Sequence, residues 1–435
     1  SIHWATQMRI FIDCTHTANY TYKNTGIHRV VRQITSELLK IAISNPTLEV
    51  IPVKFDGTFI TKVISLDEQN IMCSPQDRKE IIAVEKIAKK LGSYIHRIEN
   101  KLKQLLPGYL IVSNRIKQKS EFAGIKFSSG DIYLIADANW DLPQSYYYFL
   151  QHLKKYEVTI VSICYDLIPI KFPEFCSKDF VKCFRKFYYQ YSDCFDKVIC
   201  ISRQSAEDYI KAKKEGVLPS NNKNQVVDSF RLGSDYSKDK QLENQDDNID
   251  NYKIPSLLNQ KYILVVGSLV PHKNIKTIVA AFDLLTISNE NIHLVFAGNR
   301  GWHKDTDVLI GKNKLYEERI HILDSVTDSQ LNLLYKNCYC LVQASFYEGF
   351  GLPVVEALQH SKPVISSNGG SLPEVGGDFC LYFEPTEPIQ LYQALEKLVE
   401  SDDFYNELVT HIENNYSPFS WQESAKQLLS LLAMK

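Results

Sequence analysis

The sequence has no uninterrupted apolar run that approaches the ~18–20 residues of a membrane-spanning helix. It also carries little net charge, with a formal value of -2 over 435 residues, which argues against a nucleic-acid partner for the chain as a whole. Hydrophobic residues make up 44% of the chain and charged residues 23%, so we expect sizeable cores rather than extensive disorder. A chain of this length predicts two or three domains.

The 10 cysteines form no C-x2-C pair, the spacing on which many zinc and redox sites are built. Residues 1–7 lack the charged-then-apolar layout of a signal peptide. We therefore expect a cytoplasmic protein whose cysteines are reduced and pack in the cores. A zinc site is the alternative interpretation, and the cysteines close enough in sequence for it are Cys176, Cys183, Cys194 and Cys200. Their spacing fits no common zinc module.

The clearest interruption of the chain is polar and has no periodicity. Residues 237–256 read SKDKQLENQDDNIDNYKIPS, a composition typical of a linker. Strand-like apolar runs alternate with helical patterns on both sides of it, which predicts two α/β units, each with a parallel sheet. We place the first domain at residues 8–240, the linker at 241–256, the second domain at 257–415 and a terminal helix at 416–435.

Apolar runs place the expected strands. In the first domain they lie at residues 9–13, 48–54, 131–135, 158–164 and 197–200, with a polar loop directly after residue 13. In the second domain they lie at 261–266, 292–297, 319–323, 339–342, 363–366 and 379–383. Helical stretches are expected at 144–155, 275–285, 329–336, 352–359 and 389–400.

The sequence TGIHRVVR at residues 25–32 opens a helical pattern. Apolar residues recur at helical spacing from Ile27 to Ile41, so a helix begins near Gly26. A glycine there lets a ligand approach the helix N-terminus closely, which makes Gly26 a candidate binding residue. The alternative is that Gly26 merely starts a surface helix.

Residues 77–119 differ in character from the rest of the first domain. Their apolar positions recur at helical spacing, and their polar face is rich in lysine and arginine. One interpretation is an amphipathic helix that makes peripheral contact with the anionic inner face of a membrane. The other, which is the more frequent arrangement, is a helix that packs on its own domain and exposes its basic face to solvent.

The most informative stretch is SFYEGFGLPVVEAL at residues 345–358. An apolar run at 338–342 predicts a buried strand just before it. Gly349 and Gly351 suit a tight turn, and Pro353 suits the first turn of a helix. The turn therefore places unpaired backbone amides at a helix N-terminus, where phosphate or sugar hydroxyls can bind.

Two glutamates flank this turn. Glu348 lies in the turn and Glu356 in the helix, with seven residues between them, so both can face one crevice and bind vicinal hydroxyls. On spacing alone, an ordinary loop with two solvated glutamates is the simpler interpretation. With the Gly-x-Gly-Leu-Pro turn between them, the pair resembles the E-x7-E motif of retaining glycosyltransferases, and EGFGLPVVEAL is similar to glycosyltransferase family 4.

This resemblance covers the chain after Met8 and is strongest in the second half. It implies an α/β protein of the GT-B fold, in which two Rossmann-like domains face each other across a cleft and the C-terminal helix returns to the N-terminal domain. It also implies a Gly-containing loop, here at Gly26, that faces the donor phosphate. The resemblance further implies that Glu348 binds the donor sugar and that Glu356 binds the ribose. The backbone of Gly349, Phe350, Gly351 and Leu352 is implied to hold the sugar and the phosphate.

A second constellation follows the first strand of the second half, in VGSLVPHKN at residues 266–274. Gly267 ends the strand, and Lys273 precedes a helix, a place suited to neutralising a diphosphate. The segment is not a Walker loop. It resembles the family 4 segment in which paired basic residues hold the nucleotide diphosphate, with Ser268 and His272 at places where arginine is frequent. Lys273 is thereby implied to stabilise the leaving diphosphate, helped by a protonated His272.

Tyr165 and Asp166 follow the strand expected at 158–164. Ligands of open α/β sheets bind beyond the carboxyl ends of the strands, so Asp166 is a candidate to orient or deprotonate an acceptor hydroxyl. It can also simply cap the following turn. The segment resembles the His-Asp-Leu region of family 4, but Tyr165 stands where histidine is usual, which weakens the implication that an imidazole contacts the transferred sugar.

Two further features favour structural interpretations. Ser202 precedes a helix and is expected to be its N-cap rather than a catalytic serine. Asp305 and Asp307 resemble a D-x-D metal motif, but we interpret them as acidic residues at a helix start. We expect no metal site and no cofactor.

The resemblance implies a retaining, metal-independent glycosyltransferase that uses a nucleotide diphosphate sugar and a glycan or lipid-linked glycan acceptor. The segments TGIHRVVR and YDLIP are similar to those of bacterial polysaccharide transferases, which favours mannose as the hexose and GDP-mannose as the donor. Two alternatives stay open. One is a sugar phosphorylase or synthase on the same fold, and the other is a transferase-like scaffold without turnover.

Overall fold

The computed structural model describes residues 7–19, 26–66, 125–234, 253–298 and 304–435, together with residues 79, 82, 83, 86 and 90. The basic segment predicted at 77–119 lies outside the described residues apart from those single positions. Most of the predicted linker 241–256 lies outside them as well. Membrane contact through 77–119 therefore stays a prediction.

The first domain is built on a seven-stranded sheet with the order β3-β2-β1-β4-β5-β6-β7. Its strands are β1 (Met8–Asp13), β2 (Leu48–Phe55), β3 (Ile60–Lys62), β4 (Ile132–Ile135), β5 (Thr159–Cys164), β6 (Lys197–Cys200) and β7 (Val226–Ser229). The prediction of a wholly parallel sheet was wrong at one edge, because β3 runs antiparallel to β2. Only four residues connect these two strands, a length that suffices for a hairpin but not for a parallel crossover.

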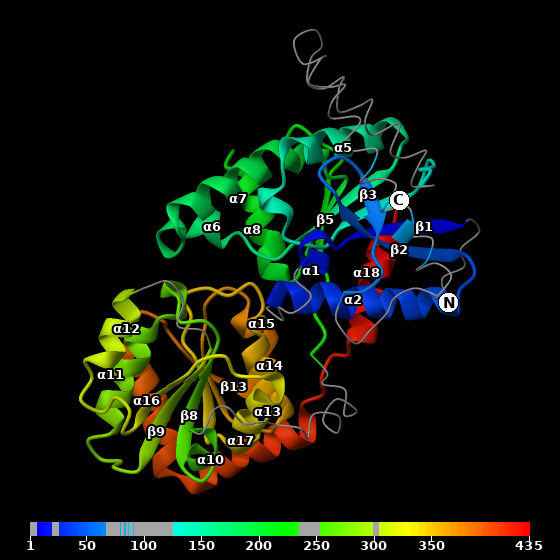
Figure 1. Cartoon of the computed structure of the whole chain (residues 1–435). Coiled ribbons are helices and arrows are strands. Elements are labelled where there is room, and N and C mark those ends of the chain that lie inside the picture. The colour runs from blue at the N-terminus through cyan, green and yellow to red at the C-terminus, as the bar shows by residue number, and fades with distance from the viewer. Residues whose placement is uncertain are drawn as a thin grey trace.

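Helices of the first domain cover both faces of this sheet (Figure 1). They are α1 (Thr15–Asn19), α2 (Gly26–Ile43), α5 (Gln144–Lys155), α6 (Ile168–Lys171), α7 (Lys178–Tyr191) and α8 (Arg203–Lys214). The polar loop expected after residue 13 is instead the short helix α1. Buried acids hold its start, since the Thr15 N–H donates to Asp13 at 3.0 Å and the Thr17 N–H donates to Asp137 at 2.7 Å.

The second domain is built on a six-stranded sheet with the order β10-β9-β8-β11-β12-β13. Its strands, all parallel, are β8 (Lys261–Val266), β9 (Ile292–Ala297), β10 (Ile320–Leu323), β11 (Cys340–Gln343), β12 (Val364–Ser367) and β13 (Cys380–Phe383). Its helices are α10 (Ile254–Leu257), α11 (Ile275–Leu285), α12 (Lys304–Gly311), α13 (Asp328–Asn337), α14 (Leu352–Gln359), α15 (Leu372–Gly376), α16 (Pro388–Glu400) and α17 (Asp402–Asn415).

Three of these helices, α10, α15 and α17, were not among the helical stretches expected from the sequence. Helix α10 begins inside the predicted linker 241–256, because Ile254 and Leu257 are buried against the second sheet. Helix α17 was not predicted. Ile412 is its one fully buried residue, so the segment shows little of the apolar periodicity that marks a helix in sequence.

The C-terminal helix α18 (Trp421–Ala433) leaves the second domain and packs on the first, as predicted (Figure 1). Its buried face, which includes Trp421 and Leu428, joins the core of β1 and α2. Lys197 of β6 donates to the carbonyl of Leu431 at 2.8 Å. The chain therefore passes from one domain to the other twice, once between residues 234 and 253 and once before α18. None of the described helices is both long and apolar enough to span a bilayer.

The return of α18 generates a stability prediction. Leu428→Ala removes a fully buried side chain and should lower the free energy of unfolding by about 2–5 kcal/mol, the usual range for a core leucine. The exposed Lys426 of the same helix provides the control, since Lys426→Ala should leave stability nearly unchanged. Urea unfolding followed by circular dichroism measures both. Equal midpoints for the two variants would show that α18 is not docked.

Candidate active site

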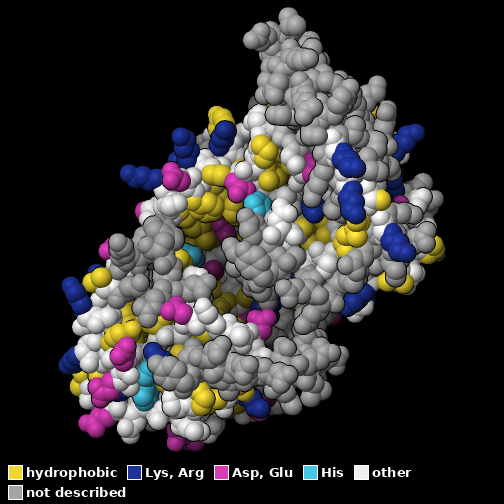
Figure 2. All heavy atoms as spheres, viewed as in Figure 1, with side chains coloured by type: hydrophobic (Ala, Val, Ile, Leu, Met, Phe, Trp, Pro, Cys, Tyr) yellow, Lys and Arg dark blue, Asp and Glu magenta, His cyan; other side chains and the backbone are white. Residues whose placement is uncertain are grey.

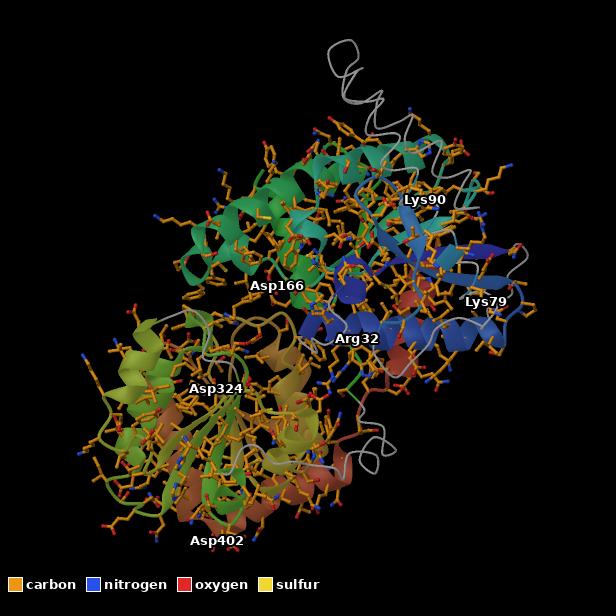
Figure 3. All side chains as sticks on the ribbon, viewed as in Figure 1. Arg32, Lys79, Lys90, Asp166, Asp324 and Asp402 are labelled. Carbon is orange, nitrogen blue, oxygen red and sulfur yellow. The ribbon has the colours of Figure 1, made fainter. Side chains whose placement is uncertain are left out.

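The carboxyl ends of the two sheets face each other, and two loops meet there. Tyr165 and Asp166 follow β5, and the Ser345–Glu348 turn follows β11. A Cβ atom added to Gly349 would lie 2.5 Å from the Tyr165 carbonyl oxygen and 3.1 Å from Asp166 Cβ. Only glycine permits this approach, so Gly349 fixes the distance between the two domains. Asp166 lies at the edge of the first domain that faces the second (Figure 3).

Glu348 is the centre of a charged cluster in this cleft. Its Oε1 accepts from Lys273 Nζ at 2.6 Å, from Ser345 Oγ at 2.7 Å and from Gln343 Nε2 at 3.1 Å. His272 Nε2 lies 3.6 Å from the same oxygen. Burial alone would raise the pKa of Glu348, but Lys273 and His272 together outweigh it and hold that pKa well below its usual value. The carboxylate is therefore charged and held in one orientation.

The position of Lys273 follows from the backbone that carries it. After β8, the chain passes through Gly267 at a φ of 121° and a 3₁₀ turn over Pro271–Lys273. Asn274 then adopts the left-handed conformation, and its side chain donates to the carbonyls of Ala344 at 3.0 Å and Pro385 at 2.7 Å. These bonds tie the Lys273 segment to the loop that carries Glu348.

The turn of Glu348 is also held from the other side, by Ser371. The Ser371 N–H donates to the Glu348 carbonyl at 2.9 Å, and its hydroxyl donates to the Gly349 carbonyl at 2.8 Å. Ser202 of the first domain in turn lies 2.7 Å from the Ser371 hydroxyl. Ser202 also accepts from the Ser205 N–H at the start of α8, which confirms its predicted role as an N-cap.

Asp166 faces this cluster from the first domain. Its Oδ1 accepts from the Ile168 N–H at 2.9 Å, so it does cap the following turn. Burial raises the pKa of Asp166 above its usual value and the charge of Glu348 adds to this, while the Ile168 bond and His272 act in the opposite direction. A raised pKa makes a carboxylate a stronger base, and so better suited to accept a proton from a hydroxyl.

Tyr165 contributes differently from Asp166. Its side chain is buried, and its hydroxyl donates to the Ala136 carbonyl at 2.6 Å within the first domain. Only its backbone carbonyl faces the turn at Gly349.

The helix that follows the turn brings in the second glutamate. Gly351, with a φ of 115°, precedes α14, so the amides around it lie ahead of the first intrahelical bonds. Glu356 is buried in α14, and its Oε1 accepts from Arg29 Nη1 at 2.7 Å. The side chain of Phe350 is buried among apolar residues of the first domain, which leaves its backbone for a ligand.

Arg29 is the residue that sequence reasoning missed. It lies on α2 of the first domain, 327 residues from Glu356. The only signal in the sequence was its position within TGIHRVVR. Two other predicted residues make no hydrogen bond or ion pair with the charged cluster among the described residues. Ser268 is exposed in its turn, and the space around a Cβ added to Gly26 is open to 4 Å, so their proposed roles stay predictions.

Among the described residues, no group of three His, Cys, Asp or Glu side chains is placed to hold a metal ion. The alternative zinc site was wrong, because its cysteines do not converge. Cys183, for example, donates to the Trp140 carbonyl and Cys194 accepts from Gln151. Asp305 is exposed in α12, as expected for an acid at a helix start.

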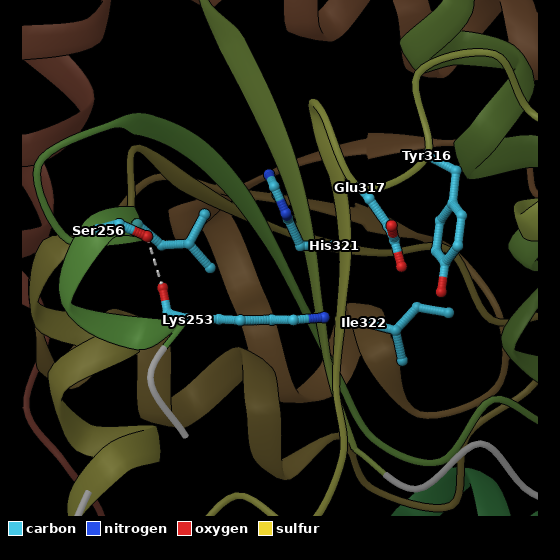
Figure 4. Close-up of a pocket in the computed structure, with 7 residues that line it drawn as sticks. Lys253, Ser256, Tyr316, Glu317, His321 and Ile322 are labelled. Carbon is cyan, nitrogen blue, oxygen red and sulfur yellow. Dashed lines mark hydrogen bonds between the residues drawn. The ribbon is translucent and has the colours of Figure 1, made fainter. Parts of the chain in front are cut away.

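A cavity of about 300 Å³ lies elsewhere in the second domain, beside the edge strand β10 (Figure 4). Its lining is Lys253, Ser256, Leu257, Tyr316, Glu317, His321 and Ile322. None of these is a predicted site residue. The cleft between the domains is instead the hollow visible in Figure 2, where acidic and histidine side chains lie beside hydrophobic ones.

Comparison with known proteins identifies one family model and several curated relatives. Residues 246–415 match the family model described as glycosyl transferases group 1. The serotype-specific mannosyltransferase WbdA of Escherichia coli is 25% identical over 314 residues, which are 71% of this chain and 38% of that protein. The O-antigen chain mannosyltransferase B of Escherichia coli is 32% identical over 172 residues, 39% of this chain and 45% of that protein. The matches thus span less than half of each of these curated relatives.

Solved structures match over nearly the whole chain. Sucrose-phosphate synthase from Thermosynechococcus elongatus has a TM-score of 0.59 at 16% identity, covering 98% of both chains. HepE from Anabaena, solved with UDP and glucose, has a TM-score of 0.59 at 15% identity, covering 99% of this chain and 100% of that one. At such identities the likeness shows the fold alone, and it confirms the predicted GT-B architecture of two Rossmann-like domains.

The contact at Gly349 can be tested by substitution. Gly349→Ala places a methyl group against the Tyr165 carbonyl, so the two loops must separate and the molecule should open. Small-angle X-ray scattering should show a larger radius of gyration, while circular dichroism stays unchanged. Gly311→Ala is the matched control, because its Cβ would meet nothing within 4 Å. Identical scattering from both variants would contradict the close approach.

The charged state of Glu348 predicts a pH dependence. Its folded pKa lies below the unfolded value of about 4.3, so its contribution to stability is complete above that pH and declines as the pH falls further. The difference in unfolding free energy between wild type and Glu348→Gln should therefore become smaller as the pH is lowered from 6 to 3.

Glu413→Gln, at an exposed position of α17, supplies the baseline for this titration. A difference between wild type and Glu348→Gln that stays constant with pH would mean that Glu348 does not titrate below its usual range.

Proposed function

We propose that the protein is a retaining glycosyltransferase, on the premise that residues 246–415 match the family model described as glycosyl transferases group 1. In this proposal it moves a hexose from a nucleotide diphosphate sugar to a hydroxyl of a glycan or lipid-linked glycan. The observation that carries the proposal is the Lys273–Glu348 pair at the turn before α14, with Asp166 opposite.

Each member of this cluster suits one part of the donor. The charge of Lys273, with His272 beside it, matches the negative charge that builds up on a departing diphosphate. The backbone amides at the start of α14 have no partner within the helix and favour phosphate. Glu348 and Glu356 supply carboxylate oxygens for the hydroxyls of the sugar and of the ribose. The binding of a donor then requires Lys273 and Arg29 to share the carboxylates that they now contact.

The reaction that we propose is a front-face displacement. The bond between the anomeric carbon and the diphosphate oxygen breaks, and the acceptor oxygen bonds to that carbon on the same face. The acceptor proton passes to the leaving phosphate oxygen, and Asp166 orients the hydroxyl. The contribution of the protein is then chiefly positioning and fixed electrostatics.

We propose mannose as the transferred hexose and GDP-mannose as the donor. Support comes from the names of the relatives WbdA and mannosyltransferase B. We further propose that the reaction needs no metal ion, because two basic side chains already face the diphosphate position. A chelator should then leave the rate unchanged.

A nucleotide screen followed by product analysis tests this function. The thermal midpoint of the protein is measured with GDP, UDP, dTDP and ADP and with their common sugars, since a ligand of the native state raises apparent stability. The best donor is then incubated with mannoside acceptors, and NMR reads the anomeric configuration of the product. Retained configuration with release of nucleoside diphosphate is the expected result. Dependence on inorganic phosphate would indicate a phosphorylase instead, and binding without turnover would indicate a scaffold.

Lys273 and Glu356 should affect different kinetic constants. Lys273→Ala should lower kcat by about 10²–10³-fold, the usual cost of removing one preorganised electrostatic group. Glu356→Ala should chiefly weaken donor binding, by roughly 10–100-fold, because it removes charged hydrogen bonds to the ribose. Steady-state assays of nucleoside diphosphate release measure both.

Lys276→Ala is the control for these variants, since Lys276 is exposed on the helix that follows Lys273. Wild-type kinetics in both Lys273→Ala and Glu356→Ala would contradict the assignments.

A further inference from the structure

Helix α7 exposes a row of basic side chains on the outside of the first domain. Its opposite face packs in the core of that domain through Phe184, Phe187 and Tyr191. Lysine and arginine side chains gather over this helix, with hydrophobic side chains beside them (Figure 2). The exposed positions recur with each turn, so they share one face of the helix. The members of the row are Lys178, Lys182, Arg185, Lys186 and Tyr189.

The positive charge of this row is not neutralised within the molecule. Among the described residues, no ion pair joins a lysine or arginine of the row to an acid. Asp179 is the only acid within the helix. On the neighbouring helix α8, by contrast, Lys211 Nζ lies 3.8 Å from Glu215. The row on α7 therefore attracts an anionic partner from outside the fold.

Apolar side chains are exposed beside these charges. Tyr189 keeps 67% of its surface exposed, and Ile210 of α8 keeps 40%. The two helices are in contact, since the ring centroids of Tyr188 and Tyr209 lie 6.1 Å apart. Tyrosine is favoured at the boundary between water and lipid, where its ring is apolar and its hydroxyl stays wet. An anionic bilayer offers both components, because charged head groups lie above an apolar layer.

The far end of the molecule carries the opposite charge. Helix α17 lies at the side of the second domain that faces away from α7 (Figures 1 and 3). It contains no lysine or arginine. Its exposed acids are Asp402, Asp403, Glu407 and Glu413. A molecule with this separation of charge turns its α7 side toward an anionic surface and its α17 side away from it.

We propose that the α7 face, formed by the row on α7 together with Ile210, docks on a bilayer that contains anionic lipids. This face is separate from the segment 77–119, and the docking itself does not depend on glycosyl transfer. Its consequence does rest on the proposed function. Only α6 and a short turn separate α7 from Asp166, so a docked molecule holds the acceptor side of the cleft near the head groups, where a lipid-linked acceptor is presented.

Two competing explanations give different results. One is that the α7 face is merely solvated, in which case no vesicle binds. The other is that it contacts the acidic α17 of a second copy of the chain. Such a contact joins two different surfaces, so it propagates from copy to copy into larger species instead of closing a dimer, and it needs no lipid.

Vesicle flotation tests the docking with the full chain. Vesicles of phosphatidylcholine alone are compared with vesicles that also contain phosphatidylglycerol, and we expect binding to the second kind only, with loss at high salt. The combined variant Lys182→Glu, Arg185→Glu and Lys186→Glu should lower the partition coefficient by roughly 100-fold, given the contribution of each cation near an anionic membrane. The same three positions changed to glutamine should give an intermediate loss, and circular dichroism verifies the fold of both variants.

The matched control is the combined variant Lys312→Glu, Lys314→Glu and Lys336→Glu. These lysines are exposed on the second domain, and the net charge of the chain changes by the same amount as in the α7 variant. The control should bind vesicles like wild type. Equal binding by the α7 variant and wild type would overturn the proposal, as would a failure of wild type to bind.

Two further measurements use the same samples. A third variant, Lys86→Glu with Lys89→Glu and Lys90→Glu, tests the segment 77–119. Loss of binding in this variant while the α7 variant still binds would overturn the α7 face in favour of that segment. Light scattering at low salt without lipid should show a species that does not grow with concentration. Large assemblies that the α7 variant abolishes would overturn the proposal in favour of contact with a second copy.

Failure of the docking is distinguishable from failure of the proposed function. Hydrolysis of the donor in solution needs no membrane, so the α7 variant and wild type should release nucleoside diphosphate at the same rate. If donor is used but no vesicle is bound, the docking falls and the glycosyltransferase proposal stands. If vesicles bind as described but no donor binds or reacts, the docking stands and the proposed function is wrong.

Discussion

The ion pair between Lys273 and Glu348 is the interaction on which the rest of the site depends. It joins the loop after β8 to the loop after β11, with an Nζ to Oε1 distance of 2.6 Å. Both side chains are largely buried, yet each keeps about one-seventh of its exposure, 15% and 14%, so a ligand can reach them. A buried carboxylate is stable only with partners, and here Ser345 and Gln343 supply two more. Removal of the lysine takes away the closest charged partner of this buried carboxylate.

The second constraint is that the same turn is also the contact between the domains. Ser371 holds the carbonyls of Glu348 and Gly349, and Ser202 reaches Ser371 from the first domain. Glu374 adds a cap to α8, because its carboxylate accepts from the Arg203 N–H at 3.0 Å. Domain closure and the orientation of Glu348 are consequently coupled. Polar contacts between the domains therefore converge on this one turn.

The sequence predicted the elements better than it predicted the contacts between them. Parallel strands that are buried on both faces read as apolar runs, which is why β6, β8 and β9 were placed at their observed bounds. Helix α17 and the antiparallel β3 lack that signal. Local motifs located Glu348 and Lys273, but the pairing of Glu356 with Arg29 joins residues from different domains. No local periodicity encodes such a contact, and the same holds for the stack of Phe175 on Phe346.

The most direct test of the account is a crystal structure with the nucleoside diphosphate that binds best. We predict that its phosphate oxygens lie within hydrogen-bonding distance of Lys273 Nζ and of the amides that precede α14. Its ribose hydroxyls should contact Glu356, with Arg29 displaced from at least one carboxylate oxygen. A nucleotide bound instead in the cavity beside β10, against Lys253 and His321, with the Lys273–Glu348 pair unchanged, would contradict the assignment of the cleft as the donor site.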